Sequence, residues 1–230
     1  MKRWTLWLAV GLLVAAAPAL KATEVLGGGY GGYYVGAVFP GLQDLNDHLK
    51  PQGLDLNPPM FCQGGGGFGY GGAILMGGFG YGGSLTAEHG GRRVELAGGG
   101  GAFEMGRIWA VGPVRLALTG LLGGYGYTLS LKPDLPDADF DSLLVHPERM
   151  TRLSTGGVMV GVGTLVFVPL TSFLALGLHA TLAYVPFGEW QLEDGAEVHG
   201  APSLLRWHPT LQVTVLFGGE GRKRAQDNGS

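Results

Sequence analysis

Glycines fall inside two runs that otherwise read as β-strands, and this pattern constrains the fold more than any other feature of the chain. Residues 65–72 and 77–83 alternate glycine with Phe and Tyr at every second position. Glycine is depleted in ordinary strands because ordering it costs more entropy than ordering other residues. Repeated glycines therefore predict backbone packed closely against aromatic rings. A small closed β-barrel, whose narrow interior leaves little room for side chains, is such a setting.

The four glycines Gly67, Gly69, Gly78 and Gly80 are expected to let neighbouring Phe and Tyr rings lie against the backbone.

The length of the chain predicts a single domain. Charged residues make up 14% of the chain and the net charge is -3, which gives no electrostatic case for nucleic-acid binding. Glycine makes up 45 of the 230 residues. The residues between the glycines are mainly Val, Leu, Phe and Tyr, which argues against disorder.

Residues 1–22 have the pattern of a secretory signal peptide. Lys2 and Arg3 precede an apolar core over residues 6–17, and small residues suited to cleavage follow. An uncleaved anchor helix is the alternative, although the apolar run is short for a span of ~20 residues. We expect a mature barrel domain over residues 23–218 and a polar tail over 219–230. Cys62 is the only cysteine, so no intramolecular disulfide forms.

Eight strands are predicted from runs of period-two alternation. They are residues 27–38, 62–73, 75–87, 91–105, 112–131, 153–168, 172–186 and 205–218. The last one alternates most clearly, with Leu211, Val213 and Val215 on one face and small or polar residues on the other. An apolar outside with a small or polar inside is typical of a membrane barrel, although a soluble barrel would have the same period.

The connections between these strands alternate in length. Long ones cover residues 39–61, 132–152 and 187–204, and very short ones lie near Ala73 and Pro169. In an up-and-down barrel the three long connections share one end and the shortest two share the other, as in outer-membrane barrels. The fourth connection, predicted over 106–111, is longer and more apolar than a tight turn.

The final strand contains Gln212-Val213-Thr214-Val215-Leu216-Phe217. With this segment, the signal peptide, the strand number and the loop asymmetry, the chain resembles small eight-stranded bacterial outer-membrane β-barrels over roughly residues 25–218. The resemblance implies an all-β, antiparallel up-and-down transmembrane barrel in the outer membrane. It also implies the lipid bilayer and the outer-membrane assembly machinery as partners. Family members often end on an aromatic residue that this machinery reads, whereas here a polar tail follows Phe217.

A helical fold is the strongest alternative, because residues 153–188 contain no Asp, Glu, Lys or Arg. Pro169 to Ser172 divide this run into two pieces of strand length, and its valines are spaced by two, which favours strands.

Aromatic belts are expected at both membrane interfaces. Their predicted members are Tyr30, Trp109 and Phe217 at one end, and Phe39, Tyr127, Phe187, Trp190 and Trp207 at the other.

Acidic residues in the fifth connection resemble a calcium loop. Asp137, Asp139 and Asp141 are spaced by two, and Glu148 stands at the twelfth position. Ser142 replaces the usual glycine at the sixth position, so a solvated acidic loop is the alternative. We expect no other cofactor.

A short amphipathic helix is predicted from Leu42, Leu45 and Leu49, either as a lid at the barrel mouth or as a helix packed on its rim.

Glu95 and Arg115 are predicted to pair inside the barrel, with Phe103 and Tyr125 filling the space around them. The sequence favours a non-catalytic barrel with a structural or surface-interaction role. A narrow channel or conduit for apolar ligands is a second hypothesis. A lipid-acting hydrolase is a third, and its candidate residues are His179 with Thr181, or His146 with Ser142.

Overall fold

The computed structural model describes residues 27–133, 151–186, 190–192, 195–196, 198, 202 and 206–221. The predicted signal peptide, the calcium loop of Asp137, Asp139, Asp141 and Glu148, the His146–Ser142 candidate and Phe187 lie outside these residues. The strands are β1 (Gly27–Val38), β2 (Met60–Gly71), β3 (Ile74–His89), β4 (Arg92–Val111), β5 (Val114–Pro133), β6 (Thr151–Pro169), β7 (Leu174–Tyr184), β8 (Gln191–Leu192) and β9 (Trp207–Glu220). The helices are α2 (Gln43–Leu49) and the 3-10 turn η2 (Lys50–Gln52).

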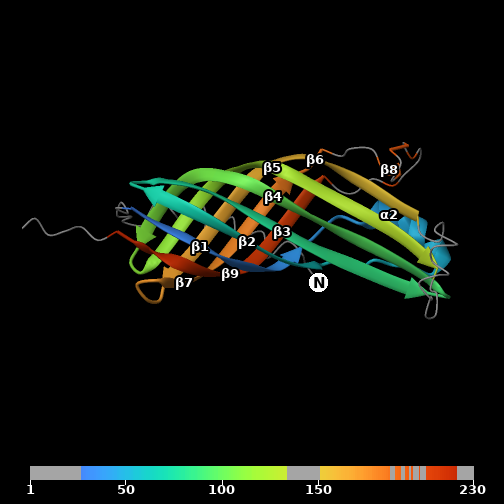
Figure 1. The fold of residues 1–230 in the computed structure, drawn as a ribbon, viewed down its shortest axis with the longest axis horizontal. Helices are drawn as coiled ribbons and strands as arrows, with labels where there is room; N and C mark the ends of the chain where they lie inside the picture. Colours follow the sequence, from blue (N-terminus) through green and yellow to red (C-terminus); the bar gives the residue numbers. More distant parts are fainter. Residues whose placement is uncertain are drawn as a thin grey trace, which may run out of the picture.

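Eight of these strands form a closed antiparallel ring (Figure 1). Neighbours in sequence pair throughout, and β1 closes the ring on β9, with Gly28 opposite Glu220 and Val38 opposite Thr210. The predicted all-β up-and-down barrel and its closure are confirmed. The two-residue β8 adds only a short pairing to the outer edge of β6. Closure leaves the ring with no unpaired edge, which is the condition for a sheet to stand in lipid.

The β2–β3, β4–β5 and β6–β7 connections lie at one end of the ring, which we call the turn end, whereas the two-residue β3–β4 turn lies at the other end. Two residues connect β2 to β3 and two connect β4 to β5, where Gly112 has a φ of 59° and precedes Pro113. The prediction of a six-residue connection at 106–111 was therefore wrong. Those residues continue β4, because a glycine with positive φ beside a proline makes a tight turn. The β1–β2, β5–β6 and β7–β9 connections leave the opposite end, the loop end, as predicted.

The strands alternate between an apolar outer face and a mixed inner face. On β9 the inward residues His208, Gln212 and Thr214 are buried, whereas outward Val213 is exposed. Large apolar residues exposed on the outer face are Tyr33, Val35, Phe61, Ile74, Met76, Phe103, Met105, Leu118, Leu122, Val160, Val162, Leu176, Leu178, Leu211, Val213 and Phe217. This is the predicted assignment of a membrane barrel. Phe103, predicted inside, is 50% exposed and faces outward.

Aromatic residues mark the limits of the outer apolar face. Trp207 at the loop end and Phe217 at the turn end are ten residues apart on β9 and both are exposed. Ten residues span about 33 Å along a strand. When strands tilt by ~40° from the barrel axis, this corresponds to ~25 Å along the axis, which equals the height of the apolar band of outer-membrane barrels. Three predicted belt members are instead buried, namely Tyr30, Tyr127 and Trp190. Side chains alternate between the two faces of a strand, and Tyr30 and Tyr127 occupy positions that point into the barrel.

The predicted glycine packing was wrong about which glycines are crowded. Gly67, Gly69, Gly78 and Gly80 face outward, where an added Cβ would lie 3.1–3.8 Å from its nearest neighbour, a backbone oxygen. Inward glycines on the alternate positions are far tighter. A Cβ at Gly32, Gly64, Gly106 or Gly123 would approach a carbonyl oxygen of the next strand to 2.1 Å or less. Close backbone approach inside a strongly curved wall, more than ring packing, explains these glycines.

The alternative of a membrane helix over 153–188 is replaced by β6 and β7, which the Pro169 turn separates. No helix among the described residues is long and apolar enough to span a membrane. The predicted amphipathic helix is confirmed as α2, with Leu45 and Leu49 buried.

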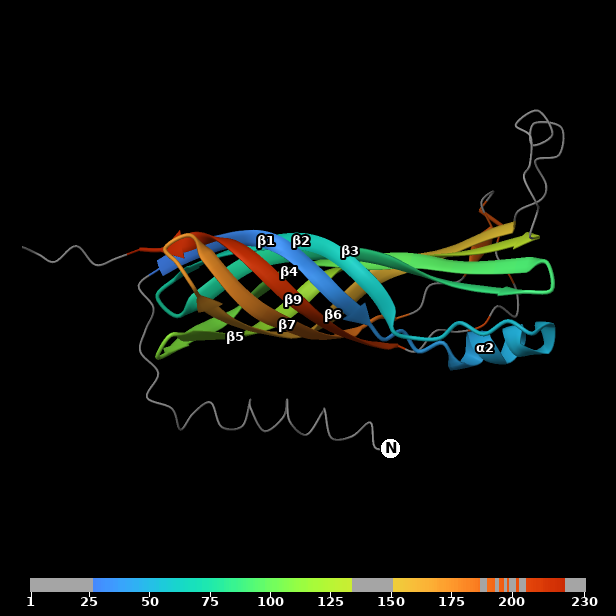
Figure 2. The ribbon, with the colours of Figure 1, turned by 90° about the horizontal axis from the view of Figure 1, so that it is seen from below.

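Four strands continue past the ring at the loop end. β3 to β6 contain 16, 20, 20 and 19 residues, whereas β1, β2 and β7 contain only 12, 12 and 11. Figure 2 shows this extension beside α2, beyond the ring. The extension and the connection containing α2 therefore form a folded structure outside the apolar band.

Candidate functional site

The connection between β1 and β2 folds around its own small core. Leu45, Leu49, Leu54 and Leu56 are buried and belong to the same cluster as the inward residues of the extended strands. Asn46 closes this loop, because its Nδ2 donates to the Leu56 carbonyl and its Oδ1 accepts from the Leu56 N–H, both at 2.9 Å. An amide that satisfies both backbone groups of one buried residue holds a loop in a single conformation.

Two contacts attach this loop to the β3–β4 hairpin. Arg92 donates a hydrogen bond to the side chain of Gln52. Gly53, with a φ of 75°, packs against the His89 ring so closely that a Cβ there would meet His89 Cδ2 at 2.3 Å. We call the loop of residues 39–59 together with the extension of β3 and β4 over residues 84–97 the platform. It is a folded, mainly polar surface at the loop end.

Asn46→Ala is expected to loosen the platform without unfolding the barrel. The Leu56 N–H and carbonyl would remain buried without partners, at a cost of ~1–3 kcal/mol. Hydrogen exchange should accelerate over residues 42–56 and stay slow in β9. Asn57→Ala is the matched control, because Asn57 is exposed and makes only a 3.5 Å contact with the Asp55 carbonyl. Equal exchange in both variants would show that Asn46 does not hold the loop.

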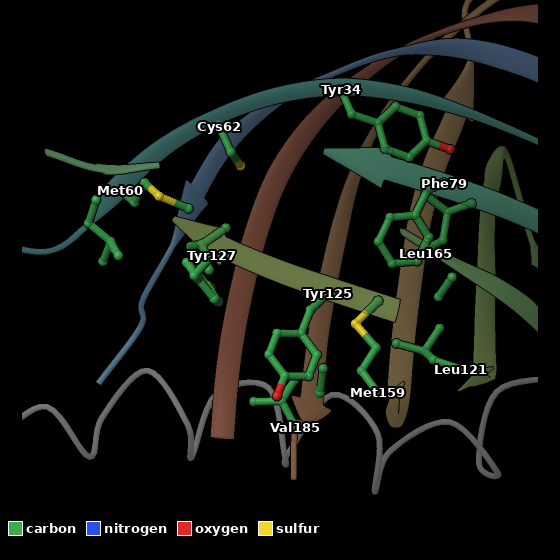
Figure 3. Packing of buried hydrophobic residues seen from close by; sticks show 14 of the residues in the cluster. Tyr34, Met60, Cys62, Phe79, Leu121, Tyr125, Tyr127, Met159, Leu165 and Val185 are labelled. Carbon is green, nitrogen blue, oxygen red and sulfur yellow. The ribbon is translucent and has the colours of Figure 1, made fainter. Parts of the chain in front are cut away.

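Below the platform the interior is filled by aromatic and polar side chains. Tyr127 Oη and His208 Nδ1 form a hydrogen bond of 3.0 Å, and Tyr125 donates to the Pro186 carbonyl at 2.7 Å. Figure 3 shows Tyr125, Tyr127 and Met159 within this packing. Tyr125 was predicted inside, and the structure places it there. Tyrosine suits such a position because its ring fills volume and its hydroxyl finds a partner.

A carboxylate and an imidazole meet in the middle of the barrel. His179 Nε2 on β7 lies 3.4 Å from Glu104 Oε2 on β4, and the side chains are 1% and 2% exposed. Thr119 donates to the same carboxylate at 3.2 Å. The His179 ring stands edge-on to Phe79, at 4.8 Å, and to Tyr34, at 5.7 Å. The pair links β4 and β7, which are not neighbours in the ring, across the barrel interior.

The same geometry argues against the hydrolase hypothesis for His179. The imidazole faces a carboxylate and two rings, and the nearby Thr119 hydroxyl donates to Glu104. A nucleophile must instead be hydrogen bonded to a base and reachable by substrate. Thr181 is also buried. His179 is better described as part of the packed interior.

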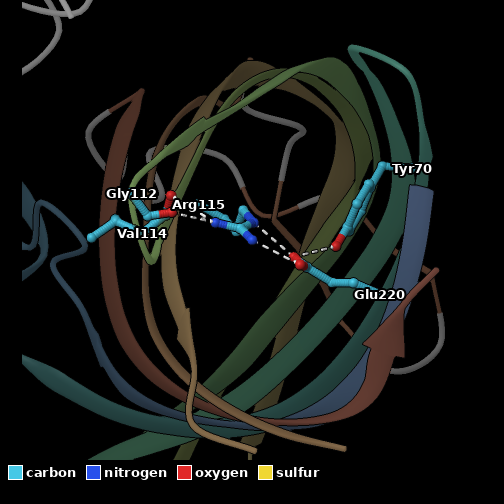
Figure 4. A network of polar contacts seen from close by, with 5 residues as sticks. All are labelled: Tyr70, Gly112, Val114, Arg115 and Glu220. Carbon is cyan, nitrogen blue, oxygen red and sulfur yellow. Dashed lines mark hydrogen bonds and ion pairs between the residues drawn. The ribbon is translucent and has the colours of Figure 1, made fainter. Parts of the chain in front are cut away.

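An ion pair crosses the lumen at the turn end (Figure 4). Arg115 on β5 contacts Glu220 on β9 through two hydrogen bonds of 2.7 Å, from Nε to Oε1 and from Nη2 to Oε2. Tyr70 on β2 donates to the same carboxylate at 2.9 Å, and Arg115 Nη1 donates to the Gly112 carbonyl at 2.9 Å. Planar two-point contact between guanidinium and carboxylate is the strong form of this interaction.

The predicted pair of Glu95 and Arg115 does not form. Glu95 stands opposite Ser130 on β5, fifteen residues or about 50 Å from Arg115 along that strand. It faces outward on the extension, where its carboxylate lies 3.7 Å from Lys132 Nζ. Arg115 does lie inside, with Glu220 as its partner. Among the described residues no cluster of three or more His, Cys, Asp or Glu side chains is arranged to hold a metal ion.

Sequence reasoning missed Glu220, Tyr70 and the Glu104–His179 pair. Glu220 was assigned to the polar tail after residue 218, but β9 continues to it. The available indication was the spacing along the strand. Glu220 is an even number of residues from Gln212 and Thr214 and therefore lies on the same inward face. The partners of His179 depend on which walls face each other, and period-two patterns do not specify that.

No protein-family model matches the chain, and no curated protein matches it significantly. Solved structures with a similar fold include Ail, the attachment invasion locus protein of Yersinia pestis, in complex with the heparin analogue sucrose octasulfate. The two chains are 11% identical, with 85% of this chain and 99% of that one covered and a TM-score of 0.45. Neisserial surface protein A is 10% identical, with 85% and 98% covered and a TM-score of 0.45. A second Ail structure is 14% identical, with 85% and 99% covered and a TM-score of 0.40. By its own strand pairings, this chain is an eight-stranded antiparallel β-barrel.

Proposed function

We propose that this protein is a non-catalytic outer-membrane barrel that presents the platform to molecules outside the cell. The observation that carries the proposal is the platform itself, which has its own buried leucines and its own hydrogen-bonded closure beyond the apolar band. A loop that only connected two strands would not need a core. The proposed export through residues 1–22 and insertion by the assembly machinery follow from the same membrane placement.

The filled interior favours this role over transport. The Glu104–His179 pair and the Arg115–Glu220 pair each bridge the lumen, and aromatic rings occupy the space between them. Tyr30, Phe68 and Phe167 meet there with ring centroids 5.3–5.9 Å apart. Eight-stranded barrels are just wide enough for side chains to fill them.

Planar-bilayer recordings are expected to show no stable single-channel currents from the unmodified protein. The bridging pairs and the rings between them lie inside the barrel, where ions would have to pass. A porin reconstituted in the same bilayers is the positive control. Reproducible unitary currents from the unmodified barrel would contradict the filled interior and favour the channel hypothesis.

The surface role is tested by removing the platform loop while keeping the barrel. Residues 42–56 are replaced by a short Gly/Ser linker, and outer-membrane vesicles carrying either chain are applied to arrays of defined glycans and proteins. We expect at least one array component to bind vesicles with the unmodified chain and not those with the linker chain. Heat-modifiable migration on gels verifies that both barrels are folded. Identical binding patterns from two folded barrels would overturn the proposed role.

A further inference from the structure

Arg107 carries its charge on the outer, apolar face of the barrel. Its strand neighbour Ile108 is buried inside, so alternation turns Arg107 outward, and it is exposed. Its register partners on the two adjacent strands are Ile74 and Leu118, which are 57% and 40% exposed. A cation is thus surrounded by side chains that suit hydrocarbon.

No carboxylate among the described residues pairs with Arg107. The ion pairs of the other arginines in this part of the chain involve Arg93 with Glu88 and Arg115 with Glu220. The Arg107 guanidinium instead lies over the Trp109 ring, 6.0 Å from its centroid. Trp109 is two residues nearer the turn of Gly112 and Pro113. The side chain therefore reaches from the apolar face towards the turn-end interface.

Physical chemistry specifies what would complete this arrangement. A charge on the lipid-facing side of a barrel is least costly near the interface, and arginine reaches the interface by extending its apolar stem. Tryptophan prefers the same depth, that of the lipid headgroups. The anions available at that depth are lipid phosphates, and a guanidinium binds phosphate through two parallel hydrogen bonds.

We propose that Arg107 and Trp109 form a binding site for the phosphate of one phospholipid in the turn-end leaflet. The inference rests on the proposed membrane placement. Ile74 and Leu118 would contact the upper part of its acyl chain. Gly120 lies one outward position further along β5, where an added Cβ would find only the Met105 carbonyl oxygen, at 3.9 Å. The wall beneath Leu118 is therefore open enough for the chain to lie against the backbone.

Native mass spectrometry of the barrel released from nanodiscs containing phosphatidylglycerol tests the site. Arg107→Gln is expected to reduce retention of the first phosphatidylglycerol about tenfold, since it removes a charge-assisted two-point contact. Arg107→Lys should retain an intermediate amount, because lysine keeps the charge and loses the planar contact. Arg93→Gln is the control, as Arg93 lies near the hairpin tip and pairs with Glu88 at 3.4 Å.

Retention that is unchanged in Arg107→Gln, or reduced equally in Arg93→Gln, would overturn the site. Circular dichroism and heat-modifiable migration verify folding of each variant. If Arg107→Gln does not fold, Trp109→Leu replaces it and should also lower retention, whereas undiminished retention would overturn the site. Flotation of the unmodified protein with liposomes separates the two proposals. If the unmodified protein does not enter liposomes, the membrane role is contradicted. If it enters liposomes and the Arg107→Gln variant still retains the lipid, only the lipid site is contradicted.

Discussion

Gly106→Ala is expected to destabilise the barrel strongly, although it adds only one methyl group. The new Cβ would lie 1.9 Å from the Leu118 carbonyl oxygen and 2.6 Å from Thr119 Cα, so β4 and β5 would have to separate. Both contacts are to backbone, which cannot turn aside as a side chain does. Overpacking of this kind costs ~1–3 kcal/mol, and the upper part of that range is expected here. Gly106→Val should prevent folding altogether.

Gly120→Ala is the matched control, because Gly120 is on the neighbouring strand and faces outward with open space around its Cβ position. It should be neutral or slightly stabilising, since alanine restricts the unfolded chain. Urea titrations of the protein folded into detergent or liposomes measure the free energy of unfolding for both variants. Equal effects would mean that inward and outward glycines have the same role, contrary to the crowding described above.

Arg115→Met is expected to lower the free energy of unfolding substantially, because it breaks the ion pair with Glu220. It leaves the Glu220 carboxylate inside the barrel with only Tyr70 as a partner. Breaking one side of a buried ion pair costs ~3–5 kcal/mol, and the lower end applies because the Glu220 side chain remains 25% exposed. Glu220→Gln should be destabilising for the converse reason, since it leaves the guanidinium without its carboxylate partner.

The double variant Arg115→Met with Glu220→Gln is expected to be milder than the sum of the single changes. Neither charge remains, so the penalty for an isolated charge disappears. A cycle of four unfolding titrations in detergent measures the coupling. Lys132→Met, at the exposed pair with Glu95, is the control and should change stability by less than ~1 kcal/mol. Additive effects at Arg115 and Glu220 would show that the two residues do not interact in the folded protein.

Much of the ring could be predicted from the sequence, because membrane strands carry a two-residue period that needs no knowledge of their partners. β1 begins and ends at the predicted residues, and the outward face of β9 is the predicted one. β4 was predicted to end at residue 105, with residues 106–111 as a connection, but the strand continues to Val111. The turn at Gly112 and Pro113 was the better marker.

The interior was predicted less well, for a reason that also lies in the geometry. Contacts across the lumen depend on the stagger of all eight strands, which is a property of the closed ring and of no single segment. Glu95 and Arg115 had suitable charges, but the register of β4 on β5 places them far apart. Glu104 and His179 were within the predicted strands, yet only closure brings their walls together. Glu220 lay beyond the predicted last strand.

The closure of the platform loop has a consequence for how this surface can diverge between related sequences. The residues that hold the loop, Asn46 and the buried leucines, alternate with exposed ones such as Gln43, Asp47 and Asp55. Exchanging the exposed set would alter the shape and charge of this surface, while the hydrogen bonds to Leu56 stayed in place. Under the proposed surface role, natural variants are expected to differ at the exposed positions and to keep the inward ones, because changes at the exposed positions cost the barrel little stability.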